Sequence, residues 1–198
     1  MNSKVYKISK RIIDIVFSVI VIALIISWLL PIVAIIIFLE SGEKTFFTQE
    51  RIGKFGVPFH ILKFKSMKGE PPKNDPLLSK NESARITKFG RFLRKYRIDE
   101  FPQFFNVLKG EMTIVGPRPE RQFFLDEIII HIPKYKKMQE LKPGITSLGQ
   151  IKYGYAHSLD QMLNRARYDL IYLDNLSLWT DFKVILSTLI VVIKGEGI

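Results

Sequence analysis

The sequence predicts a mixed α/β fold, in which one small domain follows an N-terminal membrane helix. An uncharged apolar run from Ile15 to Leu39 indicates the membrane helix, because it is longer than the roughly 20 residues that cross a hydrocarbon layer. Two strand-like segments around a glycine turn, followed by segments with helix-capping signals, indicate the α/β domain. With 198 residues, the chain divides into a membrane segment, residues 1–40, and one domain, residues 41–198.

Pro31 interrupts the apolar run. Proline removes a backbone hydrogen bond and clashes with the preceding turn, so the helix should kink near Leu30. Basic residues flank the run on both sides in nearly equal number, and the positive-inside rule then favours placing both ends on one face. These features predict a proline-broken, re-entrant helix. A straight spanning helix that tolerates its proline is the alternative.

Asp14 lies close to the start of the apolar run. Lys10 and Arg11 precede it by about one helical turn, so all three side chains fall near one another on a helix. We expect Asp14 to form an interfacial ion pair with these two residues.

The domain should begin with a β-hairpin. Thr45–Phe47 and Val57–Lys65 have strand character, and the glycines of Gly53-Lys54-Phe55-Gly56 permit the turn between them. The polar segment 68–83 contains three prolines, which predicts a loop, either a lid over a site or a plain connector.

An adjacent pair of carboxylates, Asp99 and Glu100, carries the strongest functional signal. We predict that Asp99 caps a helix from Glu100 to Lys109, with Pro102 in its first turn and Gly110 at its end. The positive end of that helix would lower the pKa of Asp99 and attract a phosphoryl group. A plain helix cap on the surface is the alternative interpretation.

The charges around this pair suit an anionic substrate. Arg91, Arg94, Lys95 and Arg97 precede Asp99, so the carboxylate should stay ionised and a bound phosphate would find partners. Downstream, a short strand Met112–Val115 ends in Gly116-Pro117-Arg118-Pro119. The two prolines should fix the backbone, so that Arg118 is held for bidentate phosphate binding.

Helices are expected in the rest of the domain. A basic helix at 87–96 precedes the carboxylate pair, and later helices are expected at about 120–130, from Pro133 onward, at 158–174 and at 180–195. Ser158 and Gln161 form a capping box for the helix that begins there. The apolar stretch Val184–Ile193 is too short to span, so the last helix should be amphipathic and lie along the bilayer or pack on the anchor.

The composition narrows the classes of function. The chain has a formal net charge of +11, with 30 Lys and Arg against 19 Asp and Glu, and a membrane segment accompanies this charge, so anionic lipid headgroups and phosphates are the expected partners. Because cysteine is absent, disulfides and thiolate catalysis are excluded, and the three scattered histidines do not suggest a metal cage. A non-catalytic membrane scaffold and a membrane-tethered nucleic-acid binder remain as alternatives to an enzyme.

An ordered set of segments resembles one family. These are KRIIDI with the proline-broken helix, FTQERIGKFGVPFHILKFKSM, RKYRIDEFPQFFNVLKGEMTIVGPRPE, LKPGIT and LWTDFKVILSTL. Together they resemble the monotopic phosphoglycosyl transferases, also called bacterial sugar transferases, in their minimal catalytic form. The resemblance covers nearly the whole chain.

The resemblance implies transfer of a sugar phosphate from a UDP-sugar to polyprenyl (undecaprenyl) phosphate with release of UMP, as a first membrane step of glycan assembly. It makes Asp99 the nucleophile that forms a covalent phosphosugar intermediate. Glu100 would assist, and both carboxylates would bind Mg²⁺.

Further roles follow by motif position in that family. Pro31 would mark the membrane break, and the catalytic domain would lie on the cytoplasmic face of the bacterial inner membrane, without nucleic acid as a partner. The resemblance leaves open a homodimer, the sugar and the pathway. The residues that it assigns to the substrate's phosphates or nucleotide are Lys65, Arg94, Pro117, Arg118 and Asp169.

Overall fold

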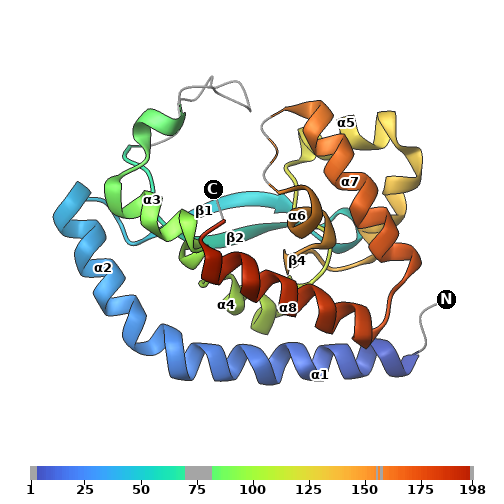
Figure 1. The fold of residues 1–198 in the computed structure, drawn as a ribbon, viewed down its shortest axis with the longest axis horizontal. Coiled ribbons are helices and arrows are strands. Elements are labelled where there is room, and N and C mark those ends of the chain that lie inside the picture. The colour runs from blue at the N-terminus through green and yellow to red at the C-terminus, as the bar shows by residue number, and fades with distance from the viewer. Residues whose placement is uncertain (1–3, 70–81, 155, 157, 197–198) are drawn as a thin grey trace.

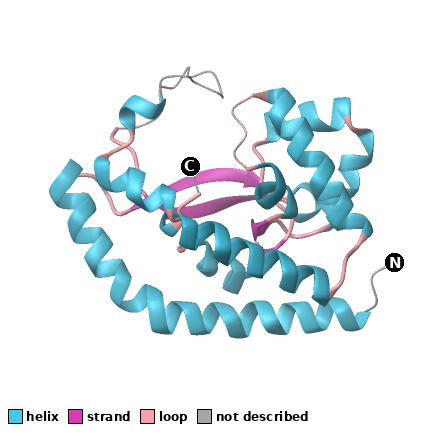
Figure 2. Cartoon of the chain, viewed as in Figure 1, coloured by secondary structure: helices cyan, strands magenta, loops and turns pink. Residues whose placement is uncertain are grey.

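The computed structural model describes residues 4–69, 82–154, 156 and 158–196. It confirms a mixed helix and sheet architecture that follows one long apolar N-terminal helix. A β-hairpin lies in the middle of the molecule, helices surround it, and the N-terminal helix runs along one side (Figures 1 and 2). Residues 70–81, most of the predicted loop at 68–83, lie outside the described residues.

The N-terminal helix has three consecutive parts. These are α1 (Lys4–Val21), the π-helical turn η1 (Ile22–Ile26) and α2 (Ser27–Ser41). By length and composition, it is the one helix among the described residues that could cross a membrane. The chain changes direction between α1 and α2 (Figure 1), so the bend begins before the predicted position near Leu30. The N–H of Ser27 bonds back to the carbonyl of Ile22, and such π turns are a common cause of helix bends.

The predicted hairpin is present and longer than expected. Strands β1 (Phe46–Ile52) and β2 (Pro58–Phe64) pair antiparallel, with Phe46 opposite Phe64, and the turn η2 (Lys54–Gly56) joins them. The prediction ended β1 too early because its second half is polar. Alternate residues of that half nevertheless stay more buried than their neighbours, as expected when one face of a strand packs on the domain.

A second, two-stranded sheet lies near the hairpin. The predicted strand at 112–115 is present as β3 (Thr113–Val115), and it pairs in parallel with β4 (Gly144–Thr146). β4 was not predicted, since three residues after a Pro-Gly pair give no periodic pattern. Gly116 and Gly144 make the contact close: a Cβ atom on Gly144 would lie 2.2 Å from the backbone nitrogen of Gly116, so a side chain has no room there.

The predicted helices are largely confirmed. Ser158 caps α7 by accepting the N–H of Gln161 at 3.3 Å, and a left-handed Gly195 ends α8. After Pro133 the chain forms 3₁₀ turns, η5 (Pro133–Glu140), instead of a regular helix. The helical elements after α2 are η3 (Glu82–Arg85), α3 (Lys88–Lys95), η4 (Ile98–Glu100), α4 (Gln103–Lys109), α5 (Gln122–His131), α6 (Leu148–Tyr153), α7 (Leu159–Asp174) and α8 (Leu178–Lys194).

The polar face of α1 packs against the domain. Asp14 is 4% exposed, and its carboxylate accepts hydrogen bonds from the Thr113 hydroxyl at 2.7 Å and the Ile114 N–H at 3.0 Å. The prediction of an interfacial ion pair for Asp14 is therefore wrong. Lys10 pairs with Asp181 at 2.8 Å, and Arg11 donates to the last carbonyls of α4. Sequence spacing cannot show that these charges have partners between 96 and 171 residues away.

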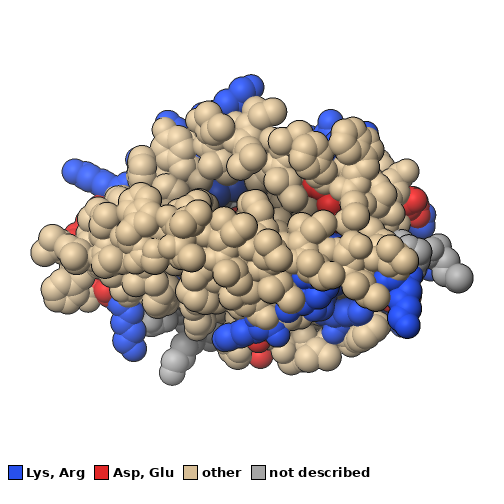
Figure 3. All heavy atoms as spheres, turned by 90° about the horizontal axis from the view of Figure 1, so that it is seen from below, with Lys and Arg blue, Asp and Glu red and all other residues tan. Residues whose placement is uncertain are grey.

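The opposite face of α1 is apolar and exposed. Figure 3, which views the molecule from the side of α1, shows a broad surface without acidic or basic groups, with Lys and Arg at its edges. Large apolar side chains on α8 are exposed as well, with Trp179 at 62% and Ile193 at 78%. The exposed apolar side chains of the N-terminal helix include Val5, Ile8, Ile12, Val16, Val19, Leu24, Trp28, Ile35, Phe38 and Leu39.

Candidate functional site

Asp99 and Glu100 lie in the 3₁₀ turn η4, and both are 7% exposed. The prediction that Asp99 caps a helix starting at Glu100 is wrong, because α4 begins only at Gln103, with Pro102 preceding it. Arg97, just before the turn, has a left-handed backbone with φ of 53°. Such a conformation is uncommon for a residue other than glycine. It turns the chain sharply from α3 into η4.

Three cations surround the carboxylate of Glu100. Lys63 Nζ lies 2.8 Å from Glu100 Oε1, and the guanidinium groups of Arg97 and Arg118 each come within 3.6 Å of its oxygens. Burial by itself would raise the pKa of Glu100, but Lys63, Arg118 and Arg97 outweigh burial and hold that pKa well below its ordinary range. Glu100 is therefore a fixed anion that gathers positive charge beside Asp99.

Asp99 has a different electrostatic environment from its neighbour. The pKa of its carboxyl is raised to about 6. Burial is the main cause and the adjacent charge of Glu100 adds to it, while Lys63, Arg94 and Arg97 act in the opposite direction. The expectation of a lowered pKa is therefore wrong, because the cost of desolvation exceeds the attraction of the cations. A pKa near 6 still leaves most Asp99 carboxylates ionised at neutral pH, as expected from the sequence.

The hairpin places Lys63 beside Glu100. The buried side chain of Asn106, in α4, accepts the N–H of Leu62 at 3.0 Å and donates to the carbonyl of His60 at 2.8 Å. These bonds fix β2 against α4, the helix that directly follows the carboxylate pair. The side chain of Asn106 thus holds β2 in a position from which Lys63 reaches Glu100.

Arg118 and Arg94 reach the site from elements other than the hairpin. Arg118 follows β3 in the Gly-Pro-Arg-Pro turn, where the carbonyl of Pro117 accepts the N–H of Gly144 at 2.8 Å. Arg94 lies on α3, whose first turn is capped by Thr87 and by the carboxylate of Glu40 at the end of α2. The site therefore combines β2, the turn after β3, α3 and η4.

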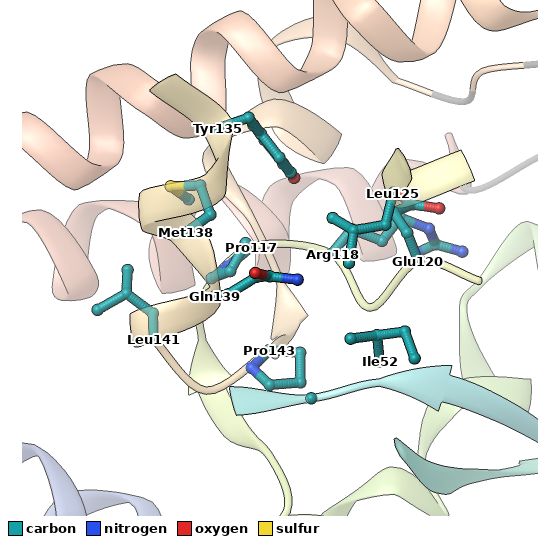
Figure 4. Close-up of a pocket in the computed structure, with 11 residues that line it drawn as sticks. Ile52, Pro117, Arg118, Glu120, Leu125, Tyr135, Met138, Gln139, Leu141 and Pro143 are labelled. Carbon is teal, nitrogen blue, oxygen red and sulfur yellow. The ribbon is translucent and has the colours of Figure 1, made fainter. Parts of the chain in front are cut away.

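A small pocket borders the Gly-Pro-Arg-Pro turn (Figure 4). Pro117 and Arg118 line it on one side, and Ile52, Tyr135 and Pro143 line it on others. The turn thus presents one arginine to the carboxylate pair and also borders a concave surface.

Two of the predicted substrate-binding residues have other contacts. Lys65 is buried, and its ammonium pairs with Glu43 at 2.6 Å. Asp169 is 1% exposed and accepts the N–H of Gly149 at 2.8 Å, at the start of α6. No hydrogen bond or ion pair that we find among the described residues joins either of them directly to Asp99 or Glu100.

Sequence reasoning missed Lys63 as a site residue and counted Arg97 only as nearby charge. In HILKFKSM, Lys63 and Lys65 alternate with apolar residues and so point to the same face of the strand. The alternation shows that one of these lysines could reach the site. It does not show which one, because that depends on how β2 packs against α4.

The carboxylate pair suits Mg²⁺ in the chemistry of its donors. Magnesium in phosphoryl-transfer sites commonly takes one or two carboxylates together with substrate phosphates. Among the described residues no group of three or more His, Cys, Asp or Glu forms a cation cage. Two buried carboxylates therefore fit a cation that also binds a substrate, and they do not fit one held by protein alone.

The position of Asp169 leads to a prediction about pH. Burial raises the pKa of Asp169 from 3.8 to about 6, so the native state binds this proton more tightly than the unfolded chain does. This group therefore destabilises the fold progressively as pH rises from about 4 to about 6. Since asparagine does not titrate, Asp169→Asn should gain stability relative to the wild type over that range, by on the order of 3 kcal/mol.

Unfolding at pH 4 and pH 7 in one detergent measures this difference. Asp174→Asn is the matched control, because Asp174 lies on the same helix with its side chain 56% exposed. A stability difference between Asp169→Asn and the wild type that stays constant with pH would contradict the prediction.

Comparison with known proteins finds similar sequences over nearly the whole chain. Residues 5–195 match the family described as bacterial sugar transferase. The UDP-N-acetylgalactosamine-undecaprenyl-phosphate N-acetylgalactosaminephosphotransferase of Aeromonas hydrophila is 38% identical over 197 residues, which cover 100% of this chain and 46% of that protein. The UDP-glucose:undecaprenyl-phosphate glucose-1-phosphate transferase of Klebsiella pneumoniae is 38% identical over 188 residues, 94% of this chain and 40% of that protein.

A shorter relative is similar over more of its own length. The UDP-glucose:undecaprenyl-phosphate glucose-1-phosphate transferase of Caulobacter vibrioides is 37% identical over 181 residues, which cover 90% of this chain and 67% of that protein. The chain spans less than half the length of the A. hydrophila and K. pneumoniae proteins. Because the family match extends over nearly all of its residues, the chain belongs to the bacterial sugar transferase family.

Proposed function

We propose that this protein transfers a sugar 1-phosphate from a UDP-sugar to undecaprenyl phosphate and releases UMP. One observation carries the proposal: Asp99, a buried and largely ionised carboxylate, lies beside Glu100, which gathers Lys63, Arg97 and Arg118. A nucleophile next to clustered cations suits a substrate with a diphosphate. Relatives over nearly the whole chain carry names that describe such transfers.

The proposed reaction has two steps. An oxygen of the Asp99 carboxylate attacks the phosphorus nearest the sugar, the bond from that phosphorus to the bridging oxygen breaks, and UMP leaves with the electron pair. A phosphate oxygen of the lipid then attacks the same phosphorus, which releases Asp99 and forms the undecaprenyl diphosphate sugar. A carboxylate nucleophile divides one difficult substitution into two easier ones.

The surrounding residues provide electrostatic stabilisation. Lys63, Arg97 and Arg118 would balance the negative charge that builds up on the phosphate oxygens. Asp99 and Glu100 would hold Mg²⁺ together with the donor's phosphates, and the ion would supply Lewis-acid stabilisation when bound.

We further propose that the N-terminal helix does not cross the membrane but keeps both ends on the cytoplasmic face. Buried residues recur from the middle of α1 to the end of α2, at Asp14, Ser18, Val21, Ile26, Val33 and Ile37. A helix that crosses a membrane keeps about 20 residues inside the hydrocarbon layer, whereas the longest interval between these buried positions is from Ile26 to Val33, so the helix stays against the domain over this length. The bend at η1 and the exposed apolar face support a helix that enters the bilayer and returns.

The reaction is tested with purified protein in nanodiscs, magnesium and a panel of UDP-sugars that includes UDP-glucose and UDP-N-acetylgalactosamine. We expect continued UMP release to depend on undecaprenyl phosphate, with at most one equivalent of UMP per protein in its absence, and to stop with EDTA. Asp99→Asn should lower turnover by at least about 10³-fold, because it removes the nucleophile. A mass increase of one sugar phosphate should appear on the Asp99 peptide of the wild type only. An adduct that survives the substitution would refute the role of Asp99.

Lys63 in β2 and Lys65, which directly follows the strand, can be compared directly. Lys63→Met removes the closest cation of Glu100, so we expect a loss in kcat/KM of roughly 10- to 100-fold. Lys65→Met breaks the pair with Glu43 and should lower kcat/KM less, although it removes an equally charged side chain from the same face of the strand. A larger loss at Lys65 than at Lys63 would return the phosphate role to Lys65, as the sequence predicted.

The topology is tested with single cysteines, which is convenient because the chain has none of its own. Lys7→Cys and Lys44→Cys place exposed thiols at the two ends of the helix. We expect a membrane-impermeant maleimide to label both in inverted vesicles and neither in intact cells. Labelling of the two positions from opposite sides would establish a spanning helix.

A further inference from the structure

The buried carboxylate of Asp14 is not required for anchoring the N-terminal helix. Its two carboxylate oxygens take different partners in β3, the Thr113 hydroxyl at 2.7 Å and the Ile114 N–H at 3.0 Å. Burial of a carboxylate is costly unless hydrogen bonds satisfy it. An apolar residue would anchor the helix at lower cost, so the contact with β3 needs its own explanation.

The β3 strand needs a partner on the side of Asp14. In the part of the chain that the structure describes, the sheet of β3 has two strands, and the N–H of Thr113 bonds toward β4, to the carbonyl of Pro143 at 2.9 Å. Successive N–H groups of a strand point to opposite edges, so the N–H of Ile114 points away from β4. Asp14 satisfies that group in place of a neighbouring strand.

β3 leads directly into the functional site. It ends at Val115, and Gly116-Pro117-Arg118 follows without a flexible joint: the N–H of Gly116 bonds to the carbonyl of Thr146 at 3.0 Å, and proline restricts the next residue. Arg118 then lies 3.6 Å from Glu100. Only three residues lie between Ile114, which bonds to Asp14, and Arg118, whose guanidinium faces the carboxylate pair.

α1 also bonds to α4, the helix that follows the carboxylate pair. Arg11, one turn before Asp14, donates to the carbonyls of Val107 at 2.7 Å and Leu108 at 3.0 Å. These carbonyls end α4, the helix that follows Asp99 and Glu100. One turn of α1 is thus bonded both to the strand that carries Arg118 and to the helix that follows the carboxylates.

We infer that Asp14 is a positioning residue, which sets the location of Arg118 relative to Glu100 by fixing β3 on the N-terminal helix. This inference rests on the proposed function for its catalytic consequence. It makes the N-terminal helix part of the scaffold of the site as well as an anchor. The carboxylate does not touch the substrate and acts through β3.

Hydrogen exchange tests the positioning directly and without any substrate. In nanodiscs, the amides of residues 113–118 other than Pro117, which has none, should exchange at least about tenfold faster in Asp14→Ala than in the wild type. Asp14→Asn should restore protection, because its amide can accept from Ile114 and donate to Thr113. Arg11→Ala is the matched control on the same helix: it should speed exchange at the end of α4 and leave residues 113–118 unchanged. Unchanged protection of 113–118 in Asp14→Ala overturns the inference.

Kinetics distinguishes positioning from a general loss of stability. Asp14→Ala should lower kcat/KM for the donor by roughly 10- to 100-fold, the size expected for a misplaced binding group. In an Arg118→Ala background, the same change should cost less than about threefold, since the group it positions is absent. An equal loss in both backgrounds overturns the inference.

Thr113→Val is a milder variant that tests the same contact if Asp14→Ala fails to fold. It removes one of the two bonds to Asp14, keeps the volume of the side chain, and should shift exchange and kcat/KM in the same direction as Asp14→Ala, by a smaller factor. If the wild type releases no UMP while Asp14→Ala still exposes residues 113–118, the proposed function fails and the positioning role stands. If the wild type releases UMP normally and Asp14→Ala leaves the exchange of residues 113–118 unchanged, the positioning role fails and the proposed function stands.

Discussion

The fold depends on the contact between the polar face of α1 and the domain. Asp14, Lys10 and Arg11 bond to β3, α8 and α4, which are far apart in the sequence. Each of these groups would be costly to bury alone, and each is satisfied by a specific partner. An amphipathic helix packed by apolar contacts can slide or rotate, whereas these bonds fix its register. The N-terminal helix is therefore fixed in one position on the domain.

The site relies on an unequal pair of neighbouring carboxylates. Both carboxylates are buried, but the cations outweigh the effect of burial on the pKa of Glu100 and do not outweigh it for Asp99. This difference suits a division of labour in which one carboxylate organises the charge and the other reacts. In the proposed reaction, the pKa of Asp99, raised to about 6, would be a chemical benefit, because a carboxylate that is less strongly stabilised as an anion is a better nucleophile while it remains ionised.

The sequence allowed the local features to be predicted, because local chemistry determines them. The hairpin followed from its glycine turn, α7 from Ser158 and Gln161, and the membrane helix from its apolar run. The family followed from ordered motifs. The interactions that were missed are those between distant residues: Lys63 with Glu100, Asp14 with Thr113, and the parallel pairing of β3 with β4. The helix predicted to start at Glu100 began later because a 3₁₀ turn took up the carboxylate pair, and capping rules alone do not distinguish these two forms.

Docking of α1 on the domain limits how a water-soluble form of this enzyme could be obtained. Deletion of the N-terminal helix would uncover Val115, Tyr172 and Val184, which pack with Val21 and Ile26 in one apolar cluster, and would leave the Ile114 N–H without its carboxylate. The shortened protein would lose part of its interior along with the exposed apolar face of the helix. Polar replacements on that exposed face, at positions such as Val5, Ile12 and Val16, would leave the interior intact and are the better route to solubility.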